Sequence, residues 1–465
     1  MTRLRAPRST GHVVDVEIGS LDANGDGLTT SRGREISVPF TIPGERVRIR
    51  LPEAERLRSA TLVEVLRPSP HRAVAQCRHF GPDAEPGLGA CGGCTWQHIA
   101  YAEQLRLKSA LVDRLVRAVV PRAPAVKPTL PATSISNPWG YRNKVHFVFG
   151  NHRSTLTMGH YARGSRRVIP VVECPVHDER GNAFAFAARD TFAAANLQAT
   201  AEGRRGTLRS LAIRVGCRTR ELMAALIVSS DRDRPLRAAT RRLIEQSRPT
   251  SMHLNIHARD DAFIFGPATR HLDGTSRMRE EVAGASFLIS PASFFQTNVL
   301  AAEILVGLVR EAVQGPRRVL DLYAGSGLFA IPLANAGSEV IAVEENRLAV
   351  ADGEAALLLN PAARRRCRFV ARRVESALPS IRDADIVVLD PPREGCSNTV
   401  ITELFGRIRP AVAIYVSCNP EALAVDLGPI ARSGYRIRAL QPVDMFPHTA
   451  HIETVAIVER VRNQT

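Results

Sequence analysis

Apolar and polar positions alternate in short runs along the N-terminal part of the chain, from about Gly11 to Arg67. Alternation is typical of strands with one buried face, and turn signals such as Pro43-Gly44 divide the runs. Five short strands at this spacing predict a small β-barrel. The runs are residues 13–21, 24–28, 34–40, 45–51 and 60–66.

The middle of the chain has a mixed pattern. A helical periodicity covers about Tyr101 to Val120, and a proline-rich linker follows over residues 121–138. From Gly140 to about Gly284, apolar runs at residues 144–150, 209–216 and 221–230 predict strands. We therefore expect a central mixed α/β region.

After about Ala285, apolar strand runs alternate regularly with helical patterns, which predicts a parallel sheet covered on both faces. The expected strands are residues 318–325, 339–345, 384–392 and 411–420, and the expected helices are 298–313, 328–336 and 347–360. The fold class is α/β, with a doubly wound, Rossmann-like domain at the C-terminus. The expected domains are residues 1–70, 71–284 and 285–465.

Composition and charge narrow the class of protein. A length of 465 residues predicts two or three domains. No run of about 20 apolar residues occurs, and the arginine-rich start leads into no signal-peptide pattern, so we expect a cytoplasmic protein without a membrane partner. The net charge of +16 favours a polyanion such as nucleic acid, although arginine-rich coding bias alone produces the same charge. A monomer is the default oligomeric state.

A glycine loop ends the first strand of the C-terminal domain. Gly325 and Gly327 follow an apolar strand and precede a helix, so the backbone can pass close to a nucleotide-like ligand. Glu344 ends the next strand, where a carboxylate can hold ribose hydroxyls. The pattern predicts a nucleoside cofactor. Because Ala330 fits the third position of a dinucleotide fingerprint, the loop alone leaves a dinucleotide open.

Asp390 lies at the carboxyl end of a later strand, the edge where open α/β sheets bind ligands. Amino-group methyltransferases place an aromatic residue after the two prolines that follow, to stack on a planar acceptor. This chain has Arg393 there. The departure favours an acceptor atom other than an amine nitrogen.

Cys418 lies at the end of the following strand, in a Ser-Cys-Asn-Pro turn on the same ligand edge. A thiol at this edge suits an acceptor that needs activation before methyl transfer. Uracil C5 is such an acceptor, because it is a poor nucleophile and becomes reactive when a thiolate adds to C6. We interpret Cys217 and Cys367 as inert core residues. A base must afterwards remove the C5 proton, and the candidates are Glu453, His448 and His451.

A set of motifs in this domain resembles the RNA uridine-5-methyltransferase family. In chain order they are Gln296 in FFQTN, the loop DLYAGSG, Glu344, DPPR, SCNP and DMFPHTAHIET. The resemblance implies S-adenosylmethionine as cofactor and RNA as substrate. The implied nucleophile is Cys418, the implied base is Glu453, and the residues implied around cofactor and base are Gln296, Tyr323, Glu344 and Asp390. Ala324 stands where the family often has a second cysteine in the loop.

The N-terminal runs resemble the TRAM domain, an OB-like barrel that binds RNA. Four further cysteines could supply thiolates to a metal centre: Cys77, Cys91, Cys94 and Cys174. From Cys91-Gly92-Gly93-Cys94 alone, structural zinc and an iron–sulfur cluster are equally open. The resemblance favours a [4Fe-4S] cluster, although the thirteen residues between Cys77 and Cys91 depart from the family's short spacing. We expect the cluster to organise the fold or the RNA surface and to take no part in methyl transfer.

Two other classes of function stay open on the sequence alone. The first is a non-catalytic RNA-binding protein, against which Cys418 and Glu453 argue. The second is an amino-group methyltransferase, against which Arg393 argues. The substrate RNA is ribosomal RNA or tRNA. The cysteine motif slightly favours ribosomal RNA, because the best-known bacterial tRNA branch of the family lacks that motif.

Overall fold

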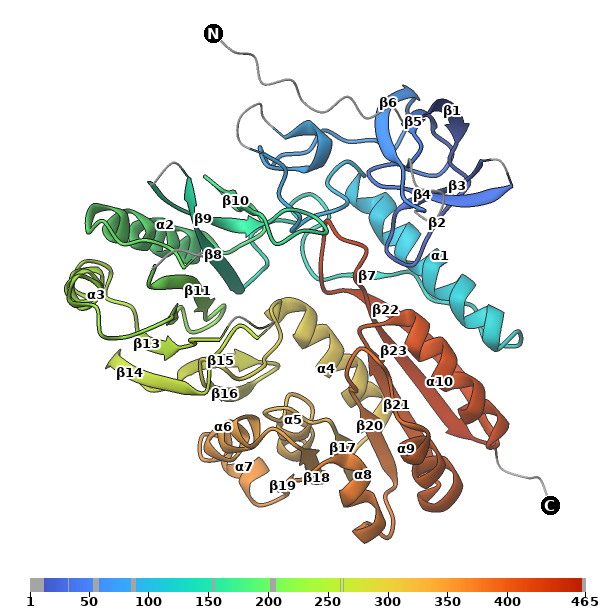
Figure 1. The fold of residues 1–465 in the computed structure, drawn as a ribbon. Helices are drawn as coiled ribbons and strands as arrows, with labels where there is room; N and C mark the ends of the chain where they lie inside the picture. The colour runs from blue at the N-terminus through green and yellow to red at the C-terminus, as the bar shows by residue number, and fades with distance from the viewer. Residues whose placement is uncertain are drawn as a thin grey trace.

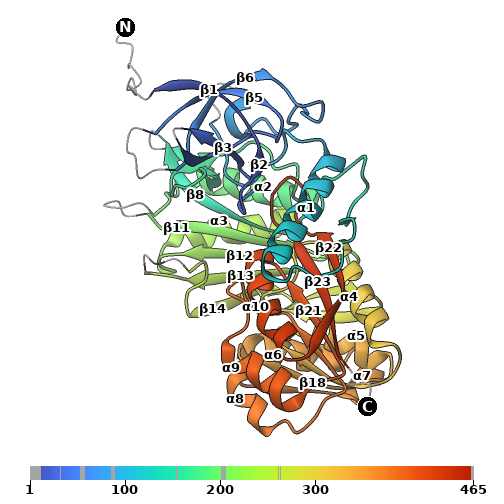
Figure 2. The same ribbon diagram turned by 90° about the vertical axis from the view of Figure 1, so that its right-hand side faces the viewer.

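The computed structural model describes residues 12–31, 33–52, 58–84, 89–152, 155–200, 206–259, 261 and 263–461. The arginines of the predicted basic start, Arg3, Arg5 and Arg8, lie outside these ranges. The chain forms a small β-structure, a central sheet and a C-terminal αβα layer, stacked in that order (Figures 1 and 2). No helix in the described ranges is both long and apolar enough to cross a membrane.

The N-terminal β-structure consists of two three-stranded sheets, ordered β1-β5-β6 and β2-β3-β4, that enclose Val38, Val47 and Ile49. The predicted single strand over residues 13–21 is wrong. It divides at Ile18, whose amide donates to the carbonyl of Glu45, so its two halves join different sheets. The strands are β1 (Val13–Glu17), β2 (Ser20–Leu21), β3 (Gly27–Ser31), β4 (Arg34–Val38), β5 (Arg46–Arg50) and β6 (Thr61–Arg67).

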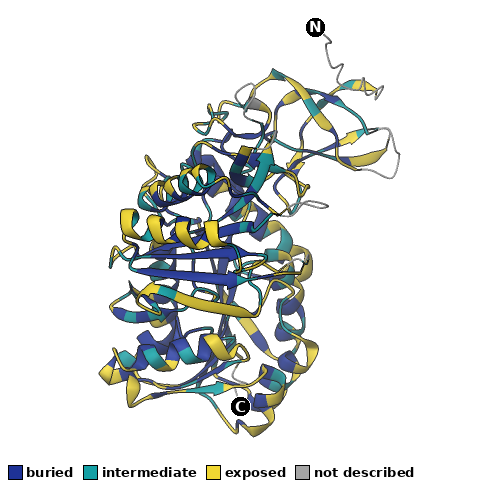
Figure 3. Cartoon of the chain, turned by 60° about the vertical axis from the view of Figure 1, so that its left-hand side comes forward, coloured by how far each residue is buried: buried dark blue, intermediate teal, exposed yellow. Residues whose placement is uncertain are grey.

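The central region is a seven-stranded sheet, ordered β10-β9-β8-β11-β12-β13-β14, with two helices packed together on it. Figure 3 shows its inner strands buried and its helices exposed on their outer side. The three strands predicted here are confirmed as β8, β11 and β12. The elements are β8 (Lys144–His152), β9 (Thr155–Tyr161), β10 (Val168–Pro170), α2 (Glu179–Ala194), β11 (Leu208–Val215), β12 (Leu222–Val228), α3 (Arg234–Ser247), β13 (Ser251–Ile256) and β14 (Ala268–Gly274).

The predicted helix after the cysteine-rich stretch is confirmed as α1 (Tyr101–Val119), but α1 packs on α10 (Pro420–Arg432) of the C-terminal layer. The proline-rich linker is also not a free connection. Its segment β7 (Leu130–Pro131) pairs with β22 (Tyr435–Asp444) and becomes the last strand of the C-terminal sheet. Residues well before position 285 therefore complete the C-terminal layer.

The C-terminal layer is the predicted doubly wound α/β domain, an eight-stranded sheet ordered β19-β18-β17-β20-β21-β23-β22-β7. One apolar core packs α4 to α7 on one face, and a second packs α1 and α8 to α10 on the other. The elements not yet named are a hairpin of β15 (Met278–Val282) and β16 (Ala285–Ile289), the strands β17 (Arg318–Leu322), β18 (Glu339–Glu344), β19 (Cys367–Ala371), β20 (Ile386–Leu389), β21 (Val412–Ser417) and β23 (Glu453–Arg460), and the helices α4 (Val299–Val313), α5 (Ala330–Asn335), α6 (Arg347–Leu357), α7 (Pro361–Arg364), α8 (Val374–Ala377) and α9 (Asn398–Thr402).

The direction of β23 departs from an all-parallel sheet. Strands β17 to β21 run parallel, whereas β23 is antiparallel to β21. An antiparallel strand begins at the edge where its neighbours end. The first residue of β23, Glu453, therefore lies at the carboxyl edge of the parallel strands.

Candidate active site

A cavity of about 840 Å³ opens at the carboxyl edge of the C-terminal sheet. It is lined by residues of the loops after β17, β18, β20 and β21, by the first residue of β23 and by the segment before α4. All but one of the predicted catalytic and cofactor-binding residues line it, namely Gln296, Tyr323, Gly325, Glu344, Asp390, Cys418 and Glu453. The exception is Gly327.

The surroundings of the two loop glycines explain why Gly325 lines the cavity and Gly327 does not. Gly325 has a φ of +55° with open space where a Cβ would be, so the backbone borders the cavity without obstruction. Gly327 has a φ of +90°, and a Cβ there would lie 2.8 Å from the ring of Phe369. Gly327 therefore serves the packing of the loop on β19 and α5.

Glu344 is held at the mouth of this loop by two backbone amides. The amide of Gly325 donates to Oε2 at 2.9 Å, and the amide of Asn346 donates to Oε1 at 2.7 Å. Both bonds fix the carboxylate at the end of β18, where each oxygen has a further lone pair to accept a ligand hydroxyl. The cavity therefore offers a carboxylate at the position that the sequence predicted for ribose binding.

The pairing of β21 with β23 brings Cys418 and Glu453 together. Ser417 pairs with Thr454 in this antiparallel ladder, so the next residues outward, Cys418 and Glu453, face each other across the strand ends. Directly opposed side chains of an antiparallel pair have Cβ atoms about 5 Å apart. Of the three candidate bases, Glu453 lines the cavity, and neither His448 nor His451 does.

Burial raises the pKa values of two acids in this cavity, Asp390 and Glu453. Burial, and then the charge of Glu344, raise the pKa of Asp390 to about 7. Burial and the nearby Asp390 also raise the pKa of Glu453 well above its usual value. Burial and both carboxyl groups raise the pKa of the Cys418 thiol to about 11. At neutral pH the resting site therefore holds Cys418 as a thiol and Asp390 about half protonated, and burial favours the neutral form of Glu453.

Arg393 is a functional candidate that the sequence analysis used only as an argument against amine methylation. It lines the cavity, and its charge lowers the pKa of both Cys418 and Glu453, opposing the effect of burial. Its carbonyl accepts a hydrogen bond of 2.9 Å from Nδ2 of Asn419, next to the cysteine. The DPPR and SCNP turns are therefore tied together, and the arginine is positioned to favour the thiolate.

The segment leading to Glu453 is anchored on α1. The ammonium of Lys108, which is fully buried, donates to Asp444 at 2.5 Å and to the carbonyl of Phe446 at 3.1 Å. Oε1 of Gln104 accepts the amide of His448 at 2.8 Å, and the ring of Trp139 stacks on the His448 imidazole at 3.8 Å between centroids. His448 thus has a structural role.

The four predicted metal ligands, Cys77, Cys91, Cys94 and Cys174, line one separate cavity of about 280 Å³ between the cysteine-rich stretch and the central region. Within the described residues, no three or more His, Cys, Asp or Glu side chains converge closely enough for a single metal ion. The residues after Cys94 reach the catalytic layer, because the amides of Thr95 and Trp96 donate to the carbonyl of His448 at 3.0 and 2.9 Å.

The remaining cysteines divide differently from the prediction. Cys367 is buried in the core, as expected. The interpretation of Cys217 as a core residue is wrong: it is exposed in the turn after β11, where its amide donates to Glu280 at 2.6 Å. Cys396, to which the sequence analysis gave no role, lines the catalytic cavity.

A doubly wound sheet with a glycine loop, a carboxylate at the end of the next strand and a cysteine–glutamate pair at its carboxyl edge is the arrangement of a Rossmann-like methyltransferase. Residues 217–461 match the family model described as tRNA (uracil-5-)-methyltransferase. The chain belongs to that family and is an S-adenosylmethionine-dependent RNA methyltransferase.

Similarity to relatives extends over nearly the whole chain. A protein of Gloeobacter violaceus described as an uncharacterized RNA methyltransferase is 35% identical, with 97% of each chain covered. A protein of Thermosynechococcus vestitus with the same description is 33% identical, over 96% of this chain and 98% of the other. The crystal structure of the tRNA (uracil-54, C5)-methyltransferase of Pyrococcus abyssi in complex with S-adenosyl-L-homocysteine has a TM-score of 0.77 and 25% identity, covering 96% of this chain and 100% of that one.

Proposed function

We propose that this enzyme methylates C5 of a uridine in RNA through a covalent bond between Cys418 and C6 of the base. The observation that carries the proposal is the juxtaposition of Cys418 and Glu453 at the ends of paired strands, inside the cavity that also holds the ribose-binding carboxylate. A thiol and a carboxyl group side by side are the nucleophile and the base that this chemistry needs.

In the proposed mechanism, the Cys418 thiol releases its proton to water, a step that the Arg393 charge favours. The thiolate then forms a bond to C6, and the C5=C6 electron pair moves into the ring as an enolate. S-adenosylmethionine, when bound, supplies the methyl group to C5. Glu453 then accepts the C5 proton, the electrons of that C–H bond restore the C5=C6 double bond, and the C6–S bond breaks to release Cys418 as a thiolate. Glu453 must be ionised before this last step, so the rise in its pKa has to be relieved once substrates are bound.

The residues present fit the methyl donor. Glu344 would accept the ribose hydroxyls, the backbone at Gly325 leaves room for the nucleoside, and Gln296 and Asp390 complete the polar lining. The target base has to leave its stack to reach the same cavity, since Cys418 is recessed at a strand end.

Four thiols line the cysteine cavity, and a four-cysteine ligand set suits either an iron–sulfur cluster or structural zinc. The family resemblance favours the iron–sulfur cluster. The cluster would be held by Cys77, Cys91, Cys94 and Cys174 and would fix the segment that binds His448, away from the methyl transfer.

We infer that the N-terminal barrel is a TRAM-like RNA-binding unit and that the enzyme acts in the cytoplasm. Of the two RNA classes, we propose ribosomal RNA as the first substrate to test. The cysteine site is the argument for ribosomal RNA. The alternative, tRNA, is the substrate named for the Pyrococcus abyssi protein, and the experiment includes both.

The test incubates anaerobically purified protein with methyl-labelled S-adenosylmethionine and unmodified tRNA or ribosomal RNA, beside a Cys418→Ala variant. We expect label in 5-methyluridine from one RNA class, and none from Cys418→Ala. A Cys217→Ala variant, which removes an exposed cysteine outside the cavity, is the matched control and should keep full activity. Methylation of another atom, or equal activity of Cys418→Ala, would overturn the proposal. An absorbance spectrum and iron and sulfide analysis of the same sample test the cluster.

A further inference from the structure

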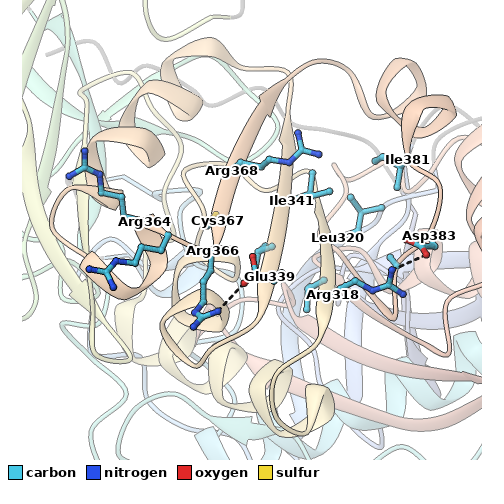
Figure 4. A pocket seen from close by; sticks show the side chains of 14 residues that line it. Arg318, Leu320, Glu339, Ile341, Arg364, Arg366, Cys367, Arg368, Ile381 and Asp383 are labelled. Carbon is cyan, nitrogen blue, oxygen red and sulfur yellow. Dashed lines mark hydrogen bonds and ion pairs between the residues drawn. The ribbon is translucent and has the colours of Figure 1, made fainter.

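A second cavity, of about 480 Å³, lies at the opposite, amino edge of the methyltransferase sheet. Its floor is apolar and consists of residues at the starts of β17, β18 and β19 and in the turn before β20, among them Leu320, Ile341 and Ile381. Five arginines and two carboxylates line it (Figure 4). The arginines are Arg318, Arg364, Arg365, Arg366 and Arg368.

The two carboxylates are already neutralised. Glu339 pairs with Arg366 at 2.9 Å and Asp383 pairs with Arg318 at 2.8 Å, as the dashed lines in Figure 4 show. Arg364, Arg365 and Arg368 are exposed, and their guanidinium groups have no ion pair or hydrogen bond in the described part of the chain. Three positive charges therefore border the cavity without a compensating group.

In the barrel, which is the expected RNA-binding unit, two arginines are held by acids. Its arginine Arg48 is bound by Asp15 at 2.8 Å and by Glu64 at 2.9 Å, and Arg67 is bound by Glu17 at 2.7 Å. Arginine is abundant throughout this chain, so abundance alone says little. The amino-edge cavity is distinctive because it gathers three arginines without acidic partners around one apolar floor.

The backbone that carries these arginines is firmly held. Asn360, which precedes α7, donates to the carbonyls of Ser286 at 2.7 Å and Ala356 at 2.8 Å. The carbonyl of Arg366 accepts the amide of Val340 at 2.7 Å, and Cys367 is buried next to it. A charged rim on an ordered backbone loses less conformational entropy when it binds a ligand than one on a loose loop.

Phosphate groups are the ligands that suit such a rim, because guanidinium groups bind phosphate oxygens in a planar, two-pronged geometry. The apolar floor suits a ribose or base face. Strand β19 has five residues, so the two edges of the sheet are about 16 Å apart. A nucleic-acid strand carries about five phosphates over that length.

We propose that this amino-edge cavity binds the phosphate backbone of the RNA substrate as it continues around the edge strand β19 from the methyl-transfer site. The inference rests on the proposed function for its choice of RNA as the polyanion. Its role is in affinity and orientation, and it takes no part in the chemistry.

The experiment compares the wild-type protein with a triple variant, Arg364→Gln, Arg365→Gln and Arg368→Gln. Dissociation constants for full-length tRNA and ribosomal RNA transcripts are measured over a range of salt concentrations. Each phosphate contact contributes about 0.7 to 0.9 to the slope of log K against log salt, so the triple variant should lower that slope by about 2 to 3. Binding of S-adenosylmethionine and the turnover number at saturating RNA should not change.

A matched control removes the same charge from the exposed side of α3 by Arg237→Gln, Arg241→Gln and Arg242→Gln. The control should leave the slope unchanged. An unchanged slope in the first triple, or an equal fall in both, would overturn the proposal. So would specific binding of inorganic phosphate with no effect on RNA, which would identify a small-anion site.

Failure of this inference is distinguishable from failure of the proposed function. If the wild type makes 5-methyluridine and the first triple variant keeps the wild-type slope, only the amino-edge site is wrong. If the wild type makes no 5-methyluridine but its RNA binding responds to the triple variant, the cavity binds RNA and the reaction is wrong.

Discussion

The two edges of the methyltransferase sheet differ in the burial of their charged residues. At the carboxyl edge, Asp390 and Glu453 are buried and their pKa values are raised. At the amino edge, Arg364, Arg365 and Arg368 are exposed and keep their charge in water. Burial converts a carboxyl group into one that can exchange a proton near neutral pH, whereas exposure keeps an arginine available to attract a distant polyanion.

The difference also bears on how the enzyme admits RNA. Six acidic residues line the carboxyl-edge cavity, and six ionised carboxylates would repel the phosphates beside the target uridine. Because burial raises the pKa values of Asp390 and Glu453, the resting site carries less negative charge than its residue types indicate. Arg393 reduces it further. The carboxyl edge therefore allows the RNA to approach and carries the reacting groups, and the amino edge attracts the RNA phosphates from a distance.

The largest expected effect comes from Glu453→Gln. This variant keeps the shape of the side chain but cannot accept the C5 proton, so the methylated base should stay bound to Cys418. We expect turnover to fall on the order of 10²- to 10⁴-fold. A protein–RNA adduct that resists denaturant and carries the labelled methyl group should accumulate, measured by gel electrophoresis.

The double variant Glu453→Gln with Cys418→Ala is the control and should form no adduct. If Glu453→Gln turned over normally, another group would be the base. If it formed an adduct without the methyl label, the carboxyl group would act before methyl transfer.

The next effect concerns the support of the carboxyl edge. Lys108→Met leaves the carboxylate of Asp444 buried without its partner, because both side chains are fully inaccessible to solvent. Removing one member of a buried ion pair costs about 3–5 kcal/mol of folding free energy. We expect a loss of this size in urea unfolding, together with slower turnover from displacement of the segment before Glu453.

The matched control is Lys108→Met with Asp444→Leu, which removes both charges. Its stability should return close to the wild-type value, since apolar replacement of a buried pair is often neutral. If the single and double variants were equally unstable, the packing of the lysine stem, and not the charge pair, would be the source of the loss.

Most of this fold follows from local pattern. The alternation of strands and helices after Ala285 predicts the doubly wound sheet, because apolar runs report burial on both faces. The direction of β23 does not follow, because strand polarity depends on which neighbours a strand joins, and periodicity carries no information about partners. The division of β1 from β2 and the pairing of β7 with β22 are contacts of the same long-range kind.

The candidate site shows the same limit at single residues. Cys418, Asp390 and Glu344 were predictable because strand ends of a doubly wound sheet meet at one edge. The role of Arg393 was missed, since its effect depends on its distance from Cys418 across two turns. Cys217 was misassigned because the prediction rested on residue type alone, and residue type does not reveal that Cys217 lies in an exposed turn.

A smaller effect is expected in the pH dependence of stability. The pKa of Asp390 is about 7 in the folded protein and about 3.9 in an unfolded chain, so between these values the folded state binds more protons. The free energy of unfolding therefore falls as pH rises from about 4 to about 7. Asp390→Asn removes this contribution, so the variant should lose less stability than the wild type between pH 5 and pH 7. Parallel urea-midpoint profiles for the two proteins would contradict the burial of this charge.

The smallest expected effect is at the amino edge, and it has opposite signs in two measurements. Glu339→Gln breaks the ion pair with Arg366. The Glu339 side chain is 60% exposed and the Arg366 side chain is 46% exposed, so folding stability should fall by no more than about 0.5 kcal/mol. The same change removes a carboxylate from the rim of the arginine cavity and frees a fourth guanidinium group. RNA should therefore bind more tightly, by about twofold to fivefold at low salt, and the salt slope should rise by up to about 1. Glu354→Gln, an exposed acid on α6 outside both cavities, should leave RNA binding nearly unchanged. Weaker RNA binding by Glu339→Gln would mean that the intact ion pair, and not the free charge, shapes this edge of the sheet.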